Sequence, residues 1–370
     1  MTTAIINGNI IGGNPSDANH IILVKDGVVT GLAAEVPAGA HIINLKGRNI
    51  SAGFIDIQLN GGYEYYFMQT PAAAALDDMV AASADFGTAF ILPCLISSSK
   101  ENILQAIETV REYMQDHPAV LGMHLEGPFI NPAKRGAHVK ELVRKPTNAE
   151  LEEIIRYGKD VIRVMTIAPE CFADEQLQLL IESGITLSAG HTEMDYTAAQ
   201  KVFSKGIQLV THLYNAMTQM GHRSPGLVGA VLDNDQVYAP IILDGAHCDY
   251  AMARIAWKAK QEKLILLSDA AFLGRQKTSF EWNGFTARLQ NGFYRNEEGN
   301  LAGAAISMVE AIQNAIMHVG IPLSTAIDMA TIRVAQAIGM EDKIGKIKAG
   351  YPARFAVFDD RLEQIETLVL

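Results

Sequence analysis

The sequence predicts an α/β protein: a (β/α)8 TIM barrel that carries a small β-sandwich domain built from both chain termini. Two observations predict this fold. In the middle of the 370-residue chain, eight apolar runs alternate with amphipathic helical windows, which is typical of parallel strands joined by crossover helices. At both ends, short apolar stretches are instead separated by turn residues, which is typical of antiparallel strands.

The two ends of the chain are expected to form one small domain. Asn7-Gly8 and Asp26-Gly27 are strong hairpin signals between short apolar stretches, and the C-terminal stretch has the same texture. Chain termini often lie close together, so the two stretches are expected to pair. We therefore assign residues 1–52 plus 343–370 to the sandwich and residues 53–342 to the barrel.

The eight apolar runs are the predicted barrel strands, each followed by a helix. They span residues 53–59, 89–96, 119–126, 161–168, 185–190, 207–212, 237–244 and 263–269. Residues 278–302 then break the pattern with two Asn-Gly pairs, and we expect an inserted β-hairpin there. Two helices should follow, over about 304–319 and 323–338.

Composition and charge exclude several classes of protein. Apolar residues make up 49% and charged residues 19%, which supports a large core and argues against disorder. The net charge is −11 without a basic cluster, which argues against nucleic acid as a partner. No apolar run is long enough for a membrane span, and the N-terminus lacks signal-peptide features. Three widely spaced cysteines indicate reduced thiols, so we expect a cytoplasmic protein.

Polar residues follow five of the eight apolar runs, at the strand ends where barrel enzymes carry their active sites. These residues are Glu126, His191, His212, His247 and Asp269. Two histidines and one carboxylate from separate strands suit a divalent ion such as zinc, with a fourth position left for water. Taken singly, each residue has a structural alternative: a hydrogen-bonded histidine, a turn glutamate or a helix-capping aspartate. All of these alternatives would have to hold together to remove the site.

Ten segments in order along the chain carry a family resemblance. The most specific are GMHLEGPFIN (122–131), SAGHTEMD (188–195) and THLYNAM (211–217). With them, the chain resembles the N-acetylglucosamine-6-phosphate deacetylase family of the amidohydrolase superfamily nearly end to end. The resemblance implies hydrolysis of the N-acetyl group of a phosphorylated amino sugar, giving acetate and the free amine.

The resemblance also implies a role for individual residues. Glu126, His191 and His212 match the metal ligands, Asp269 matches the catalytic acid/base, and His247 matches a residue that polarises the scissile carbonyl. We expect substrate-binding positions at His138, Asn215, Ala216, Arg223, His247, Gln58, Asn60, Leu301 and Met308. In this family the arginine reaches the active site of the neighbouring subunit, so a homodimer is expected.

The chemistry explains these residue types. An acetamide is a poor electrophile, and a bound metal both polarises its carbonyl and acidifies water. Asp269 would take the water proton and pass it to the leaving amine. Arg223 and the Asn215 segment would supply charge-assisted bonds to phosphate, so an acidic protein can bind an anionic sugar. The expected metal is zinc, with iron, manganese and cobalt as alternatives.

Two departures from the family pattern shape the prediction. Many amidohydrolases have HxH after the first strand, where this chain has Gln58-Leu59-Asn60; amides are poor zinc ligands, so we expect one metal per subunit. Ala271, Ala304 and Ala305 replace more polar residues, which either alters the acyl pocket or has no effect.

Three alternatives stay open. One is deacetylation of a related sugar phosphate, such as N-acetylgalactosamine 6-phosphate. Another is a catalytically inactive relative, which the presence of all four central residues disfavours. The third is a cyclic-amide hydrolase of the dihydroorotase type, which typically uses two metals and a bridging lysine; no lysine ends any of the eight runs.

Overall fold

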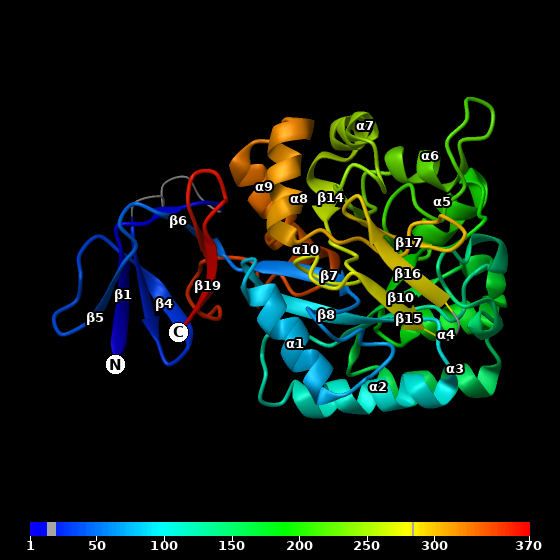
Figure 1. The fold of residues 1–370 in the computed structure, drawn as a ribbon, viewed down its shortest axis with the longest axis horizontal. Helices are drawn as coiled ribbons and strands as arrows, with labels where there is room; N and C mark the ends of the chain where they lie inside the picture. Colours follow the sequence, from blue (N-terminus) through cyan, green and yellow to red (C-terminus); the bar gives the residue numbers. More distant parts are fainter. Residues whose placement is uncertain (13–19, 283–284) are drawn as a thin grey trace.

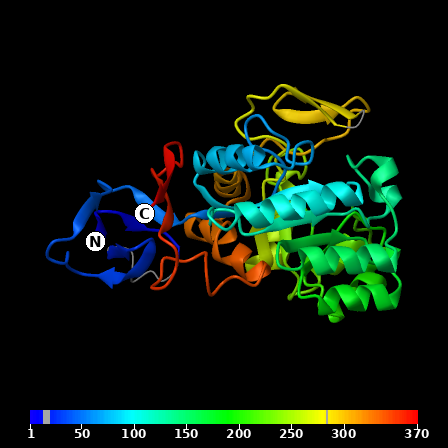
Figure 2. The same ribbon diagram turned by 90° about the horizontal axis from the view of Figure 1, so that it is seen from below.

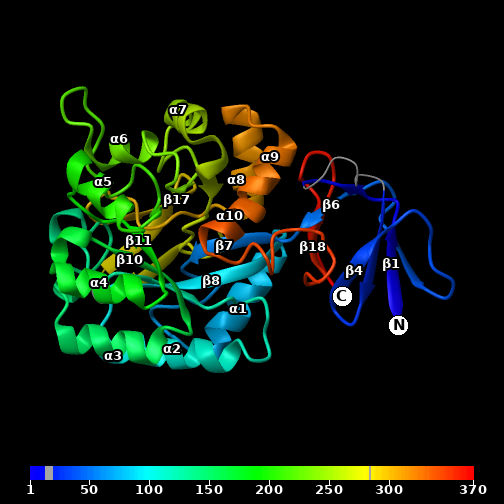
Figure 3. The ribbon, with the colours of Figure 1, turned by 180° about the vertical axis from the view of Figure 1, so that it is seen from behind.

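The computed structural model describes residues 1–12, 20–282 and 285–370. An all-β part holds both chain termini, and a larger α/β part lies beside it (Figure 1, and from behind Figure 3). Among the described residues, no helix has the length and apolar character needed to cross a membrane.

Eight parallel strands form the centre of the α/β part; seven lie within a predicted run, and β8 begins one residue before its run. They are β7 (Phe54–Leu59), β8 (Thr88–Ile96), β9 (Met123–Glu126), β10 (Ile162–Ile167), β11 (Thr186–Ala189), β12 (Leu209–Val210), β13 (Ala239–Ile241) and β14 (Leu264–Leu266). Six of them form one sheet in the order β12-β11-β10-β9-β8-β7, and β13 pairs with β14. Nearly every strand residue is buried, as expected for a parallel sheet covered on both faces.

Short contacts join the two sheets at both seams. Leu209 and Tyr238 form a parallel bridge between β12 and the start of β13. Leu59 and Ala270 form another between β7 and the residues after β14, where Asn60 N donates to Ala270 O at 2.9 Å. The first and eighth strands are therefore neighbours in space.

A helix follows each of the first seven strands and covers the outside of the sheet with one apolar face. These helices are α1 (Ala73–Ala84), α2 (Lys100–Tyr113), α3 (Asn148–Gly158), α4 (Asp174–Glu182), α5 (Tyr196–Ser204), α6 (Gly226–Leu232) and α7 (Tyr250–Lys260). In α2, the Ser99 side chain caps the start by accepting from Asn102 N, and Ile103, Ile107 and Val110 face the core. The alternation of strand and helix predicted from the sequence is confirmed.

The insertion after β14 has three strands where the sequence predicted two. β15 (Ser279–Trp282), β16 (Phe285–Gln290) and β17 (Phe293–Asn296) form an antiparallel sheet that lies on one side of the α/β part (Figure 2). The second Asn-Gly pair, Asn291-Gly292, turns the chain with both residues at positive φ. The first pair, at 283–284, lies outside the described residues.

The predicted helix over 323–338 is two helices. α8 (Met308–Asn314) precedes them, and α9 (Leu323–Met329) and α10 (Ile332–Ala337) are separated at Thr331, whose backbone is not helical (φ −132°, ψ −98°). The Thr331 hydroxyl donates to Ile327 O at 2.7 Å, and Ile55 N of β7 donates to Ala330 O at 2.9 Å. Strand β7 thus forms a hydrogen bond with the Ala330 carbonyl, which a continuous helix would need for its own hydrogen bonding.

Strands from both ends of the chain form the all-β part. One sheet has the order β4-β3-β1-β5 and the other β19-β18-β6-β2. Their strands are β1 (Thr2–Ile6), β2 (Asn9–Ile10), β3 (Ile21–Lys25), β4 (Val28–Ala33), β5 (His41–Asn44), β6 (Asn49–Ala52), β18 (Arg354–Phe358) and β19 (Ile365–Val369). On β18, Phe355 and Val357 join the core of this part, whereas Phe358 on the other face joins the core of the α/β part. The pairing of the two chain ends is confirmed.

Candidate active site and metal centre

The polar residues at the strand ends converge on one cavity of about 210 Å³. Of the residues singled out in the sequence, those that line it are Asn60, Glu126, His138, His191, His212, Asn215, Ala216, His247, Asp269 and Leu301. They come from the ends of six of the eight strands or the connections that follow them, and from the insertion, so only the fold brings them together.

Three of the ionisable residues among them have an unusual backbone. His191, His212 and Asp269 have φ angles of 50°, 30° and 48°, in the left-handed region that residues other than glycine seldom adopt. Such conformations persist only where the surrounding structure enforces them, and they cluster at functional sites. Each residue follows a strand directly or within a few positions, so the strained turn aims its side chain across the cavity.

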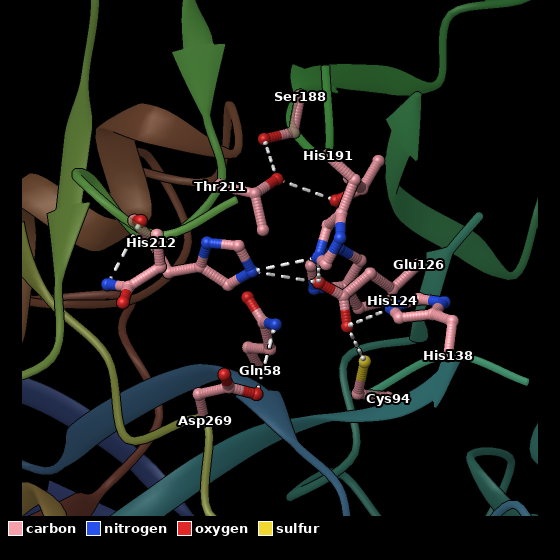
Figure 4. Close-up of polar contacts among 12 residues, drawn as sticks. Gln58, Cys94, His124, Glu126, His138, Ser188, His191, Thr211, His212 and Asp269 are labelled. Carbon is pink, nitrogen blue, oxygen red and sulfur yellow. Dashed lines mark hydrogen bonds and ion pairs between the residues drawn. The ribbon is translucent and has the colours of Figure 1, made fainter. Parts of the chain in front are cut away.

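Glu126, His191 and His212 meet at their side-chain tips (Figure 4). Glu126 Oε1 lies 3.1 Å from His191 Nε2 and 3.2 Å from His212 Nε2, and the two Nε2 atoms are 3.1 Å apart. All three side chains are buried. A carboxylate oxygen and two ring nitrogens this close together require a shared positive charge, which ring protons or a cation can supply.

The surroundings of His191 favour a cation. His191 Nδ1 lies 2.8 Å from the backbone oxygen of Lys134, which can only accept, so Nδ1 carries the hydrogen and the neutral ring presents its Nε2 lone pair to the cluster. This arrangement, with the outer nitrogen bonded to a carbonyl, is typical of metal-binding histidines. The donor set of two imidazoles and one carboxylate therefore fits a divalent ion such as zinc.

Asp269 lies on the other side of the cavity and is held by two amides. Gln58 Nε2 and Asn60 Nδ2 donate to Asp269 Oδ1 at 3.1 and 3.0 Å, which leaves Oδ2 available for a ligand. Burial and the nearby Glu126 raise the pKa of Asp269 to about 6. Gln58 Oε1 and Asn60 Oδ1 are buried without a hydrogen-bond partner among the described residues, and Asn60, which lines the cavity, can accept a hydrogen bond from water or substrate there.

His138 presents a donor to the cavity. Ser97 N donates to His138 Nδ1 at 3.2 Å, so the hydrogen of the neutral ring is on Nε2. That Nε2 lies 3.8 Å from Glu126 Oε2, and the Cys94 thiol donates to the same oxygen at 3.7 Å. Burial, together with the charge of Glu126, raises the pKa of Cys94 well above its usual range, so the sulfur stays a neutral donor. This contact was not predicted from the sequence.

His247 is oriented by a carboxylate. His247 Nδ1 and Asp244 Oδ2 are 2.6 Å apart, and Asp244 Oδ1 accepts from the backbone of Ala246 and His247. These bonds turn Nε2 of His247 toward the cavity that the residue lines.

Three predicted site residues do not line the cavity. Gln58 acts on it only through Asp269, Met308 is buried at the start of α8, and Arg223 is exposed. Arg223 lies in the connection between β12 and α6, which projects beyond the helices in Figure 1. Ala271, Ala304 and Ala305 are also buried but do not line the cavity.

Two aromatic residues of the insertion were missed. Phe280 and Trp282 line the cavity from β15, while Ser279 and Glu281 on the other face are exposed. The alternation of polar and aromatic residues in this strand was a readable signal for one buried face. The prediction of a plain hairpin gave no reason to place that face over the active site.

Comparison with known proteins decides the family. The model of the amidohydrolase family matches residues 49–369. The chain belongs to the amidohydrolase family. It is 38% identical to N-acetylglucosamine-6-phosphate deacetylase of Haemophilus influenzae, over 91% of this chain and 89% of that protein. It is 35% identical to N-acetylgalactosamine-6-phosphate deacetylase of a Shewanella species, over 92% and 87%.

Solved structures agree with the sequence relatives. The crystal structure of N-acetylglucosamine-6-phosphate deacetylase from Pasteurella multocida matches with a TM-score of 0.94 and 33% identity, covering 100% of this chain and 98% of that one. The family resemblance stated from the sequence motifs is therefore confirmed. Within this amidohydrolase, Gln58 and Asn60 support Asp269 by hydrogen bonds.

Proposed function

We propose that this amidohydrolase removes the acetyl group from N-acetylglucosamine 6-phosphate, giving acetate and glucosamine 6-phosphate. The observation that carries the proposal is the meeting of Glu126 Oε1, His191 Nε2 and His212 Nε2 within 3.2 Å, in the cavity that Asp269 also lines. N-acetylgalactosamine 6-phosphate is the second candidate, because a relative at 35% identity is named for that substrate.

Glu126, His191 and His212 would hold one divalent ion per subunit, with zinc the first choice and iron, manganese or cobalt as alternatives. When bound, the ion polarises the amide carbonyl and acidifies water. One ion is favoured over two because Gln58 and Asn60 use their amide groups to hold Asp269.

Asp269 is the proposed acid/base. With Oδ1 held by two amides, Oδ2 takes the proton of the attacking water and then gives it to the nitrogen of the leaving amine. Burial raises the pKa of Asp269 above its usual range, which makes it a better proton acceptor from water than an exposed carboxylate.

His247 and His138 are proposed substrate contacts. His247, fixed by Asp244, faces the carbonyl oxygen and helps to polarise it. His138 offers an Nε2 hydrogen to a sugar oxygen, because its Nδ1 is already occupied by Ser97. Asn60 and Leu301 complete the wall, and we assign no substrate contact to the buried Met308.

The phosphate would be bound partly from a second subunit. None of the described residues that line the cavity is a lysine or an arginine, although the proposed substrate carries a dianion. Asn215 and Ala216 line the cavity and would contact the phosphate, whereas Arg223 is exposed on the projecting loop. We infer a homodimer in which Arg223 of one subunit reaches the cavity of the other.

Three wider features belong to this proposal. The bridges at both seams support closure of the eight strands into a (β/α)8 barrel. The separate core of the terminal sheets supports a sandwich domain of residues 1–52 plus 343–370 beside a catalytic domain of 53–342. Three free, buried cysteines support a reducing compartment, the cytoplasm.

Acetate release from a panel of N-acetylated hexosamine 6-phosphates and their unphosphorylated forms tests the function, alongside metal analysis. We expect fastest turnover of the glucosamine compound, loss of activity after chelation and recovery with Zn²⁺. Preference for the galactosamine compound would select the second candidate. A metal-loaded protein that releases no acetate from any of them would contradict the proposal.

A further inference from the structure

A chain of buried polar side chains lies beneath the three proposed metal ligands. Ser188, Thr211, Thr166 and His124 are each at most 2% exposed. Their hydrogen bonds run from Ser188 Oγ to Thr211 Oγ1 at 2.7 Å, from Thr211 Oγ1 to Thr166 Oγ1 at 2.7 Å, and from Thr166 Oγ1 to His124 Nε2 at 2.8 Å. Ser188, Thr211 and His124 are labelled next to the ligand cluster in Figure 4.

The chemistry of the last bond gives this chain a single direction. His124 Nδ1 lies 2.9 Å from Ile57 O, which can only accept, so Nδ1 carries the hydrogen of the neutral ring. Nε2 must then accept, and Thr166 donates to it. Each hydroxyl has one hydrogen, so Thr166 accepts from Thr211, and Thr211 accepts from Ser188.

The hydrogen-bond chain connects the strands that carry the proposed metal ligands. Ser188 is on β11, three residues before His191; Thr211 directly precedes His212; and His124 is on β9, two residues before Glu126. Thr166 on β10 links the three.

Gly190 shows how closely these groups are packed. A Cβ atom at Gly190 would lie 2.7 Å from Thr211 Cβ, 2.8 Å from Thr211 Oγ1 and 2.9 Å from Thr166 Cγ2. Contacts this short do not occur between real side chains, so the residue before His191 must be glycine for the two threonines to meet here.

His212 needs this support most. His191 is oriented by its bond to Lys134 O, but His212 Nδ1 is buried and has no hydrogen-bond partner among the described residues. The ring of His212 is therefore placed through its backbone, which has an unfavourable φ of 30°. Thr211, the residue just before it, is held by hydrogen bonds to Ser188 and to Thr166.

We propose that the hydrogen-bond chain Ser188→Thr211→Thr166→His124→Ile57 is the positioning scaffold of the metal centre, holding His212 and Glu126 at ligand distance. This inference rests on the proposed metal site. Its members touch neither substrate nor ion, and they act by setting the geometry of the residues that do.

The test compares Thr211→Val, which keeps the shape but removes the hydroxyl, with Thr211→Ser, which keeps the hydroxyl. The zinc dissociation constant is measured by competition with a chelator, and the Co²⁺-loaded forms are compared by visible absorption. We expect Thr211→Val to bind Zn²⁺ about 10- to 100-fold more weakly with an altered Co²⁺ spectrum, the size typical for loss of a group behind a metal ligand. Thr211→Ser should resemble the wild type in both measurements.

Several outcomes would overturn the scaffold. Equal zinc affinity of the wild type and Thr211→Val would do so, even if the variant unfolds at a lower temperature, because that pattern marks a purely structural role. If Thr211→Val does not fold, Ser188→Ala serves instead, since it removes only the first donor; unchanged affinity there would also overturn the proposal, and a several-fold loss would support it. A wild type that binds no divalent ion would overturn the metal site itself, and the scaffold with it.

Discussion

Single hydrogen bonds to the backbone decide which ring nitrogen His191 and His138 present to the cavity. Lys134 O holds Nδ1 of His191, so its Nε2 faces Glu126; Ser97 N occupies Nδ1 of His138, so its Nε2 is a donor. Asp269 follows the same logic, with one oxygen held and the other left for chemistry. The reactivity of the site thus depends on partners that take no part in the reaction.

Asp269→Asn tests the acid/base assignment. The asparagine Oδ1 can still accept from Gln58 and Asn60, so the geometry should survive, but the amide cannot take a proton. We expect acetate release to fall by about 10³-fold while the metal content stays unchanged. Asp233→Asn, a charge removal at a carboxylate that contacts Tyr196 outside the cavity, is the control and should keep full activity. An active, metal-loaded Asp269→Asn would refute the role.

Asp56 gives a pH-dependent prediction for stability. It is buried on β7 and accepts hydrogen bonds from Ser268, yet burial raises its pKa from 3.8 to about 6. Between these values the folded chain holds a proton that the unfolded chain has released, so stability falls as pH rises. Across this pH range, the free energy of unfolding should fall by about 3 kcal/mol.

The asparagine in Asp56→Asn cannot ionise, so this variant should not become less stable in this way as the pH rises. Urea unfolding of the metal-free wild type and variant at pH 4 and pH 7 measures this effect, because groups that do not interact with Asp56 contribute equally to both chains. We expect the wild type to lose stability relative to the variant on going to pH 7. A difference that is the same at both pH values would contradict the shifted pKa.

The insertion sheet supplies one wall of the cavity through Phe280 and Trp282. Phe280 of β15 packs against Tyr66, Phe272 and Tyr294 with ring centroids 5.0, 5.2 and 5.5 Å apart. This aromatic cluster fastens the sheet to the barrel, and the same face of β15 presents Trp282 to the cavity. Strand β15 therefore contributes both to the packing of the sheet and to the wall of the cavity.

Phe280→Ala tests that coupling. Removal of the ring leaves a cavity in the cluster and should lower the free energy of unfolding by about 3 kcal/mol. It should also raise KM, because the sheet is less firmly held over the substrate. Urea unfolding and steady-state kinetics measure the two effects, and Phe280→Leu, which keeps most of the volume, should show smaller changes in both. An unchanged KM would show that the sheet does not shape the binding site.

At the scale of the whole molecule, one subunit by itself is expected to lack part of the phosphate-binding site. The described lining of the cavity provides the proposed metal ligands, the proposed acid/base and hydrogen-bond donors, but no side-chain cation for a phosphate. A local positive charge from a second copy would let a protein of net charge −11 bind a dianion.

Arg223→Ala should raise KM for phosphorylated substrates and leave the slow hydrolysis of unphosphorylated sugars unchanged. Mixed dimers of Arg223→Ala and Asp269→Asn contain one complete site, so a random mixture should recover roughly a quarter of wild-type activity. Activity assays on mixtures whose heterodimer content has been verified measure this. No recovery would contradict the shared site, and equal effects on both classes of sugar would contradict the phosphate contact.

The sequence by itself determined the order of elements and the residue types of the site. Alternating apolar runs and helical windows placed all eight strands, because burial on both faces leaves a continuous apolar run that local pattern can show. Glu126, His191, His212, His247 and Asp269 were found because strand ends in such a fold face one side. The short motifs around them then indicated the family.

Only the tertiary structure decided how these residues are oriented and supported. The bonds of His191 to Lys134 and of His138 to Ser97 join segments 57 and 41 positions apart, which no local pattern encodes. The break at Thr331 arises because a distant strand takes the Ala330 carbonyl, and the contact of Phe280 with the cavity depends on where its sheet docks. Local propensity fixes the elements, whereas ring tautomers, strained backbone angles and cavity walls follow from contacts that form when the strands assemble.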